Sequence, residues 1–193
     1  MHDIDSKSRL RAEALARRAT MLPEERAAAA RSLRDTLLSL PEVEMAGTVA
    51  AYMSIGAEPD TRGLLFALWK RGTYVLVPVL LPDGDLDWAS YEGPESLEPG
   101  PRGLWHPTEP PRGRDAICSA DVVLAPAVAV DRTGTRLGRG GGSYDRALAR
   151  VGPAILTIAL LYDPELVDAV PAEAHDRRVR AAATPSGGLA RFT

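Results

Sequence analysis

The sequence has little cysteine and no long apolar segment. Cys118 is the single cysteine among 193 residues, so no disulfide can form within the chain. No apolar stretch approaches the length that spans a bilayer. The first twenty residues carry charged side chains where a signal peptide would have its apolar segment. These absences predict a cytoplasmic protein that is not bound to a membrane.

An excess of positive charge is also missing. The formal net charge is −3 and the pI is about 5.7, which argues against a general nucleic-acid-binding protein. Lysine is scarce, because Lys7 and Lys70 are the only lysines and arginine supplies the remaining permanent positive charge. A retained lysine therefore indicates a place where a compact, flexible ammonium group is wanted.

What the chain does contain is an alternation of helical and strand patterns. Its length predicts a single domain over residues 1–193. The alternation predicts an α/β fold with a mostly parallel central sheet flanked by helices. Residues 92–114 are predicted to be a long loop, and the tail from about residue 186 is a candidate for disorder. Helices are expected at residues 6–19, at 23–40 and after Asp60, and strands at 48–54, 74–81, 86–91, 122–130 and 154–161.

The most informative stretch is the glycine loop, residues 131–146, which follows a buried strand pattern and leads into a helix start at Tyr144. Strand, glycine loop and helix start, in that order, present backbone N–H groups to an anion. Arg136 and Arg139 add positive charge. The pattern favours a phosphate ligand. Four glycines allow the backbone to approach such a ligand closely: Gly138, Gly140, Gly141 and Gly142.

Spacing alone leaves a second interpretation open. The loop is not a P-loop, because Gly142 is followed by Ser143 and Tyr144 in place of Lys-Ser/Thr. It is not the dinucleotide-binding fingerprint either, because its glycines lie too close together. A glycine-rich turn with an ordinary helix cap at Ser143, and with Asp145 favoured by the helix dipole, fits about equally well.

The residues themselves separate the two interpretations. The run Arg136-Leu-Gly-Arg-Gly-Gly-Gly-Ser-Tyr-Asp145 resembles the signature of the 5-formyltetrahydrofolate cyclo-ligases, also called methenyltetrahydrofolate synthetases. In that family the run typically reads R-L-G-[YR]-G-x-G-Y-Y-D. Ser143 departs from the pattern, since the family usually has a tyrosine there. The resemblance implies that this loop belongs to an ATP site.

Lys7 and Arg11 recur on one helical face together with Arg18. On spacing alone, a solvated charged face is the more typical interpretation. The resemblance reverses it, because cyclo-ligases begin with a Lys-x-x-x-Arg element. It implies that Lys7 and Arg11 approach the nucleotide phosphates.

A third motif follows the first predicted strand. Tyr52-Met-Ser-Ile-Gly-Ala-Glu58-Pro-Asp60-Thr61 resembles the family's Y/F-x-S-x-x-x-E-x-[DE]-T. The resemblance implies that Met53, Glu58 and Tyr144 hold the folate. A glutamate is chemically apt, because a pterin ring offers adjacent N–H donors to a carboxylate. The alternative is that Glu58 only precedes a helix and is stabilised by its dipole.

Two other stretches resemble the family but depart from it. Arg102 stands where an aromatic residue is expected, and His106 where Glu or Gln is usual. Trp105 is either a displaced stacking surface or a side chain that packs on its own domain. Residues 171–180 end in Arg180, where the family has a magnesium-binding aspartate. We expect Arg180 either to point away from the metal or to contact phosphate, and favour the contact.

The resemblance covers about residues 7–185 and implies ATP- and Mg²⁺-dependent conversion of 5-formyltetrahydrofolate to 5,10-methenyltetrahydrofolate, with release of ADP and phosphate. It implies catalytic roles for Lys7, Arg136 and Arg139, and a magnesium ligand in Asp145. The ATP contacts would come from Lys7, Arg11, Arg136, Gly138, Arg139, Gly140, Gly141, Gly142, Ser143 and Tyr144.

Two alternatives remain from the sequence. One is a non-catalytic paralogue that binds folate or nucleotide without turnover. The other is a sugar-phosphate isomerase, which needs a general base beside the loop and no ATP. The expected partners are the small molecules ATP and 5-formyltetrahydrofolate, with no nucleic acid and no membrane, and the chain is expected to be a monomer.

Overall fold

The computed structural model describes residues 2–192, with side chains from residue 6 onward except that of Arg102. Within this range the α-helices are α1 (His2–Thr20), α2 (Pro23–Leu38), α3 (Pro41–Glu44), α4 (Arg62–Lys70) and α5 (Ser143–Leu148). The strands are β1 (Thr48–Ala51), β2 (Tyr74–Leu80), β3 (Leu86–Ser90), β4 (Leu97–Pro99), β5 (Trp105–Pro107), β6 (Val122–Pro126), β7 (Ala129–Asp131), β8 (Arg136–Leu137), β9 (Leu156–Leu160), β10 (Leu166–Val167), β11 (Ala181–Thr184) and β12 (Gly188–Arg191).

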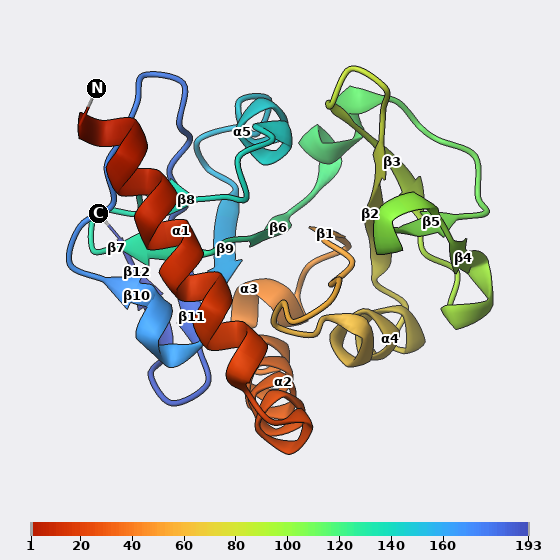
Figure 1. Ribbon diagram of the computed structural model, residues 1–193. Coiled ribbons are helices and arrows are strands. Elements are labelled where there is room, and N and C mark those ends of the chain that lie inside the picture. The colour runs from red at the N-terminus through yellow and green to blue at the C-terminus, as the bar shows by residue number, and fades with distance from the viewer. Residues whose placement is uncertain (1, 193) are drawn as a thin grey trace.

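A seven-stranded sheet forms the centre of the molecule, in the order β12-β11-β9-β6-β1-β2-β3 (Figure 1). The five inner strands run parallel to one another, whereas β12 and β3 pair antiparallel at the two edges. Two small sheets, β10-β7-β8 and β4-β5, accompany it. The prediction of a mostly parallel α/β sheet flanked by helices is confirmed.

Helices cover both faces of the sheet, with α2 and α4 on the side opposite α5 (Figure 1). Leu33 of α2 and Leu68 of α4 share a core with Val49. The next residue in β1, Ala50, belongs to the other core, together with Leu148 of α5. Neighbouring residues of a strand point to opposite faces, so a strand covered on both sides must be apolar throughout. This explains why the central strands read as continuous apolar runs.

The apolar run 122–130 is not one strand, so that prediction is wrong. β6 ends at Pro126, and after a bend the chain continues as β7 in the small sheet with β10 and β8. Proline has no N–H to donate to a neighbouring strand. At the bend, the Ala127 carbonyl accepts a hydrogen bond from Arg18, and the Val128 N–H donates to the Leu137 carbonyl. Other elements therefore satisfy the backbone at the bend.

Two further segments are more ordered than predicted. Part of the expected loop 92–114 forms the hairpin β4–β5, in which Glu98 pairs with His106. The tail after residue 186 contains β12, which pairs with β11 through Ala182 and Ala190. The expectation of a disordered tail is therefore wrong as far as residue 192. None of the helices in the described part is both long enough and apolar enough to cross a membrane.

A buried ion pair anchors α1. Arg18 is 2% exposed; its Nε donates to Glu165 Oε1 at 2.6 Å, and its Nη2 donates to Glu165 Oε2 at 2.8 Å and to the Ala127 carbonyl at 2.6 Å. The guanidinium also lies over the Tyr162 ring, 5.6 Å from its centroid. A bidentate arginine–carboxylate pair fixes orientation as well as charge. It ties the first helix to a turn far along the chain.

We expect Glu165→Gln to lower the free energy of unfolding by about 3–5 kcal/mol, because the Arg18 guanidinium loses its counter-charge while staying buried. Glu42→Gln is the control. It removes an exposed ion pair with Arg191, whose side chains are 41% and 51% exposed, and exposed pairs are worth at most about 1 kcal/mol. Urea denaturation measures both losses. Equal, small losses would show that the Arg18 pair does not hold α1 in place.

Candidate active site

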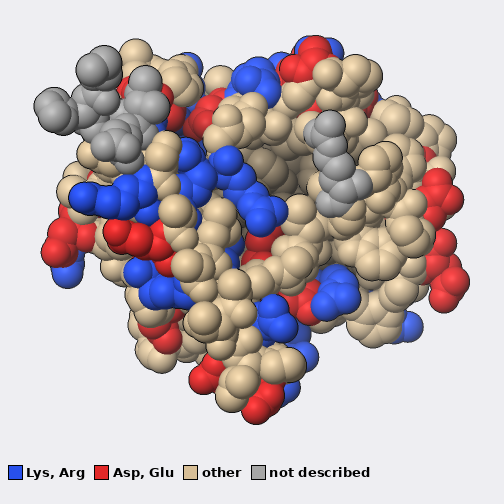
Figure 2. Space-filling view, in the orientation of Figure 1, with Lys and Arg blue, Asp and Glu red and all other residues tan. Residues whose placement is uncertain are grey.

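A cleft of about 360 Å³ opens at the carboxyl ends of β1 and β6. From β1 the chain proceeds to β2 and β3 on one side, and then returns to β6 on the other. Open α/β sheets bind ligands at such a reversal, because the loops after the two strands diverge there. Residues that follow β1 and residues that follow β6 both line this cleft. Figure 2 shows the hollow, with lysine and arginine side chains gathered beside it.

The glycine loop forms one wall of the cleft, and Asp131 shapes its first turn. Asp131 Oδ1 accepts the N–H groups of Thr133 at 2.8 Å and Thr135 at 3.1 Å. Gly134 in this turn has φ +81°, and a Cβ there would come within 2.3 Å of the Val179 carbonyl oxygen. Glycine is therefore required for the turn that returns the chain as β8.

Arg136 of β8 is a buried cation in this wall. Its Nη2 donates to Asp145 Oδ1 at 2.8 Å, and its Nη1 donates to the Pro126 carbonyl at 3.1 Å. Gly138 packs so closely that a Cβ would lie 2.9 Å from Nη1. The Nε of Arg136 is buried without a partner among the described residues. An unpartnered buried donor is costly, which favours a bound acceptor at this wall.

The loop backbone is also available for binding. No hydrogen bond between described residues uses the N–H groups of residues 138–142. Gly140 and Gly142 have φ of +103° and +68°, values that residues with a Cβ rarely adopt. From α1, Arg11 donates its Nε to the Gly138 carbonyl at 2.8 Å. Arg11, Arg136, Arg139 and the loop N–H groups thus share one wall; that they bind a nucleotide stays a prediction.

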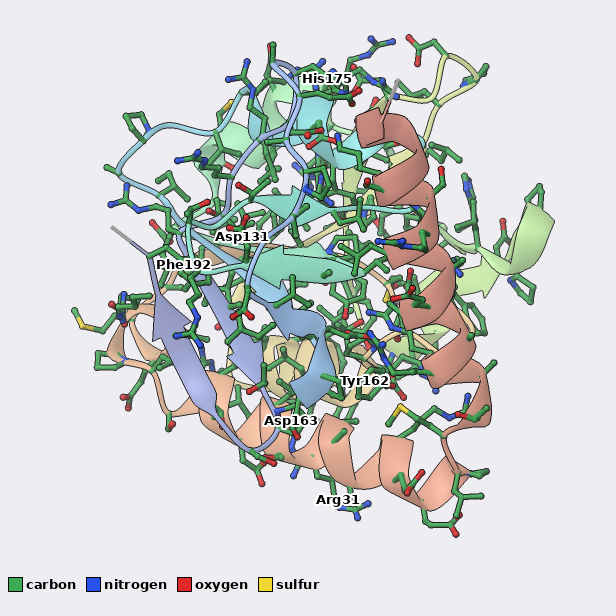
Figure 3. The ribbon with its side chains drawn as sticks, turned by 60° about the vertical axis from the view of Figure 1, so that its left-hand side comes forward. Arg31, Asp131, Tyr162, Asp163, His175 and Phe192 are labelled. Carbon is green, nitrogen blue, oxygen red and sulfur yellow. The ribbon has the colours of Figure 1, made fainter. Side chains whose placement is uncertain are left out.

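Lys7 lines the same cleft, but carboxylates already hold its ammonium group. Lys7 Nζ donates to Glu173 Oε2 at 2.8 Å and to Asp176 Oδ2 at 2.7 Å. Burial would lower the pKa of Lys7, but the two carboxylates raise it overall. His175, from the same segment, lies near the N-terminal end of α1 (Figure 3). A phosphate that binds Lys7 must replace or join these carboxylates.

The sequence did not identify Glu173 and Asp176 as the partners of Lys7. The available signal was two acidic residues flanking His175 in a segment that otherwise resembles the family motif. Their pairing with a lysine near the other end of the chain depends on the fold, which places residues 173–176 beside α1.

The opposite wall is the loop after β1, which the side chains of Thr61, Tyr52 and Asp60 hold in place. Thr61 Oγ1 donates to the Tyr52 carbonyl at 2.8 Å and accepts the Ser54 N–H at 3.1 Å. The Tyr52 hydroxyl donates to the Pro59 carbonyl at 2.6 Å. Asp60 Oδ1 accepts the Arg62 N–H at the start of α4, as expected of a residue at this helix start. These bonds leave Glu58 at the tip of a fixed loop.

Glu58 is 9% exposed, and its Oε2 accepts the Ile55 N–H at 3.0 Å. Burial raises the pKa of Glu58, and the Ile55 bond and the charge of Arg139 offset this only in part. Arg139 Nη1 lies 3.7 Å from Glu58 Oε1. The cation of the glycine loop and the acid of the strand-end motif thus meet across the cleft, although they are far apart in the sequence.

Met53 and Tyr144 add apolar surface between the two walls. The Tyr144 ring lies edge-on to Trp88, with centroids 6.3 Å apart. Its hydroxyl is buried and has no hydrogen-bond partner among the described residues. Burial, and then the charge of Glu58, raises the pKa of Tyr144 far above its usual value, so the hydroxyl keeps its proton and can donate it to a ligand acceptor.

Asp145 is the predicted metal ligand, and only one of its two carboxylate oxygens is paired within the described residues. Its Oδ1 accepts hydrogen bonds from Arg136 and from the Arg177 N–H, whereas Oδ2 takes part in no hydrogen bond between described residues. Magnesium at nucleotide sites commonly takes one or two carboxylates together with phosphate oxygens. Ligand atoms of Glu173, His175 and Asp176 also lie within 4.8 Å of one another, but Lys7 already pairs with two of these residues.

Arg180 lies outside the cleft. Its N–H donates to the Thr157 carbonyl at 3.0 Å, at the start of β9 and β11, so it sits at the amino ends of the parallel strands. The cleft is at their carboxyl ends, and the expectation that Arg180 contacts a phosphate there is wrong. Trp105 lines the cleft, whereas His106 is exposed. The side chain of Arg102 lies outside the described residues.

The model of the 5-formyltetrahydrofolate cyclo-ligase family matches residues 3–185. The chain belongs to this family. A 5-formyltetrahydrofolate cyclo-ligase of Mycolicibacterium smegmatis is 40% identical over 190 residues, which are 95% of this chain and 96% of that protein. The Escherichia coli cyclo-ligase is 33% identical over 177 residues, covering 88% and 95% of the two chains.

A solved structure agrees with the cyclo-ligase relatives. The NMR structure of Aquifex aeolicus 5,10-methenyltetrahydrofolate synthetase superposes with a TM-score of 0.83 and 29% identity, covering 96% of this chain and 92% of that one. The resemblance read from the glycine loop and the two shorter motifs is therefore confirmed at the level of the cyclo-ligase family. The roles of individual residues stay predictions.

The buried carboxyl of Glu58 predicts a pH-dependent stability. Its pKa is raised in the folded state, so its ionised form is less favourable there than in the unfolded chain. That penalty is absent well below its ordinary pKa of 4.5 and grows as the pH rises above it. We expect Glu58→Gln, which keeps an oxygen for the Ile55 N–H, to be more stable than the wild type near neutral pH. Thermal unfolding at several pH values measures the difference, and a difference independent of pH would contradict the assignment.

Proposed function

We propose that this chain catalyses the ATP-dependent conversion of 5-formyltetrahydrofolate to 5,10-methenyltetrahydrofolate, with release of ADP and phosphate. The observation that carries the proposal is the approach of Arg139 to Glu58, 3.7 Å apart in a single cleft. The first belongs to a phosphate-binding loop and the second to a wall suited to a pterin. Two substrates bound in this way would have their reacting groups in contact, and such positioning supplies much of the catalysis of phosphoryl transfer.

At the nucleotide end, the proposed ligands of the phosphates are the cations and the uncommitted loop N–H groups. Arg136 donates from a buried position, while Arg139 is half exposed and free to follow the transferred phosphoryl group. Lys7 and Arg11 line the cleft from α1, and Arg11 bonds to the loop; Ser143 and Tyr144 follow the glycines. Preorganised donors of this kind stabilise charge that develops in a transition state.

At the folate end, Glu58 would accept adjacent N–H groups of the pterin through its Oε1, and Met53 and Tyr144 would pack on the ring. The hydroxyl of Tyr144 is a buried donor that lacks a partner in the described part of the ligand-free chain, so a substrate acceptor would satisfy it. Of the residues proposed to bind the folate, Tyr144 is the one that is also proposed to contact the nucleotide.

The proposed chemistry has two steps. The formyl oxygen attacks the γ-phosphorus, the bond to the β,γ-bridging oxygen breaks, and ADP leaves as an iminium phosphate forms on the folate. N10 then attacks the activated carbon and loses its proton, and the C–O bond breaks to release phosphate. Lys7, Arg136 and Arg139 would stabilise the transferred phosphoryl group in both steps. A magnesium ion would supply charge neutralisation on the phosphates, with Asp145 as its protein ligand.

The direct test mixes the protein with MgATP and 5-formyltetrahydrofolate and follows methenyl absorbance together with ADP. We expect one ADP per methenyl product, and no product without ATP, after chelation of magnesium, or with heat-denatured protein. Folate binding with no product above the denatured control would instead identify a non-catalytic paralogue. Turnover of a sugar phosphate without ATP would identify an isomerase.

Folate affinity tests the role of Glu58. We expect Glu58→Gln to weaken 5-formyltetrahydrofolate binding by about 1.5–3 kcal/mol, the range for a charge-assisted hydrogen bond. It should not weaken ATP binding, because it removes the charge that holds Arg139. Glu173→Gln is the matched control, because it alters a carboxylate of the same cleft at the nucleotide end and should leave folate affinity unchanged. Calorimetric titrations that show equal losses of both ligands for Glu58→Gln would make Glu58 a purely structural residue.

We further propose that the enzyme acts as a cytoplasmic monomer, in which the glycine loop and the loop after β1 of the same chain form the two walls of the cleft. Light scattering during gel filtration should give the mass of a single chain with and without substrates. A stable dimer would contradict this part of the proposal.

A further inference from the structure

We propose that Ser143 and Arg146 are positioning residues that hold the glycine loop in its nucleotide-binding shape, by fastening it to the turn between β2 and β3. We call the two side chains and the Gly84 carbonyl the hairpin clasp. The inference rests on the proposed function, because it assigns the clasp to the ATP end of the same cleft. Arg146 does not line the cleft itself, so it acts through the loop and not on the substrate.

Two side chains converge on one carbonyl in the clasp. The Ser143 hydroxyl donates to the Gly84 carbonyl at 2.6 Å, and Arg146 Nη2 donates to the same oxygen at 2.6 Å. Arg146 Nη2 also donates to the Gly141 carbonyl at 2.9 Å, inside the glycine loop. One guanidinium thus bridges the hairpin turn and the loop. Charge-assisted bonds of this kind are stronger than bonds between neutral groups.

Glycines on both sides make room for the Arg146 guanidinium. A Cβ at Gly84 would lie 3.0 Å from Nη2, and a Cβ at Gly142 would lie 2.9 Å from Nη1. Both glycines have positive φ, +81° and +68°, which residues with a Cβ rarely adopt. The clasp therefore needs glycine at two positions far apart in the sequence. For Gly142, this requirement is separate from any approach to phosphate.

The hairpin turn is a firm anchor for the loop. Asp85 is 3% exposed and accepts Arg150 Nη2 at 2.5 Å and Arg114 Nη1 at 3.1 Å. Arg114 also pairs with Asp83 at 2.7 Å. The Leu81 N–H bonds to the Asp85 carbonyl, and the Gly84 N–H bonds to the Leu81 carbonyl, which closes the turn. Ser143, Arg146 and Arg150 all reach this turn from α5 and the turn that follows it.

The clasp has a consequence for binding. The loop between β8 and α5 has no hydrogen bonds between described residues through its N–H groups, so its own backbone does little to hold it in one shape. Arg11 holds the start of the loop through the Gly138 carbonyl. Without the clasp, the rest of the loop would have to be ordered at the moment the nucleotide binds, and that ordering costs affinity. Loss of the clasp should therefore raise the KM and Kd for ATP and leave the same constants for folate unchanged.

The test compares Ser143→Ala and Arg146→Ala with the matched control Arg114→Ala. Arg114 contacts the same hairpin turn but not the glycine loop. For Arg146→Ala we expect the KM for ATP and the Kd for a magnesium-bound, non-hydrolysable ATP analogue to rise roughly tenfold, equivalent to about 1.4 kcal/mol. Ser143→Ala should show a smaller rise in the same two constants. The KM for 5-formyltetrahydrofolate should stay unchanged in both, and Arg114→Ala should lower the melting temperature while ATP affinity is retained.

Three results would overturn the inference. If the wild type binds the analogue and both clasp variants bind it equally well, the role assigned to the clasp is wrong, while the proposed function stands. If Arg114→Ala weakens ATP as much as Arg146→Ala, the effect is general loosening of the turn. If the wild type does not bind the analogue at all, both the clasp and the proposed function fail. Circular dichroism before titration shows whether each variant keeps the fold.

Discussion

A buried ion pair between Arg18 and Glu165 holds the first helix near its C-terminal end. Because the same guanidinium bonds to the Ala127 carbonyl, it also fixes the bend where the chain leaves the central sheet after Pro126. That bend faces the cleft, and Lys7 and Arg11 lie on the same helix as Arg18. The ion pair therefore helps to place Lys7 and Arg11, which line the cleft from the same helix. The interaction is strong only while both charges are present, since a lone buried charge is far costlier than none.

In the described part of the ligand-free chain, protein carboxylates pair with three cations of the cleft, whereas Arg11 bonds to the Gly138 carbonyl. Lys7 pairs with Glu173 and Asp176, Arg136 with Asp145, and Arg139 with Glu58. If the nucleotide binds as proposed, its phosphates would replace or join these carboxylates. At Arg139 and Glu58 the proposed exchange would connect the two substrates: a phosphate that draws Arg139 away would free the Glu58 oxygen proposed to bind the folate. Any such coupling must act equally in both directions.

The chemistry of the site could be predicted from the sequence further than its geometry. Apolar runs without alternation indicated a parallel sheet, and the glycine loop with its arginines indicated an anion site. The division of residues 122–130 between two sheets could not be predicted, because the second half pairs with Leu166 and Arg136, and neither pairing is a local property. The same holds for Ser143. In the sequence Ser143 is a departure from the family pattern, whereas in the structure it bonds to Gly84. The sequence around Gly84 gives no sign that the turn between β2 and β3 contacts the glycine loop. Arg180 is the opposite example. It replaces a family aspartate, but it lies at the amino ends of the parallel strands, away from the cleft where we expected it to act.

The central claim is that one cleft binds the nucleotide at the glycine loop and the folate at the loop after β1. Amide hydrogen exchange with each ligand added separately tests it most directly. A magnesium-bound ATP analogue should protect residues 138–142, whose N–H groups make no hydrogen bond within the described structure, and 5-formyltetrahydrofolate should protect residues 53–58. Protection of neither segment, or protection centred on the second cavity beside Arg17, Tyr162 and Ser186, would contradict the account.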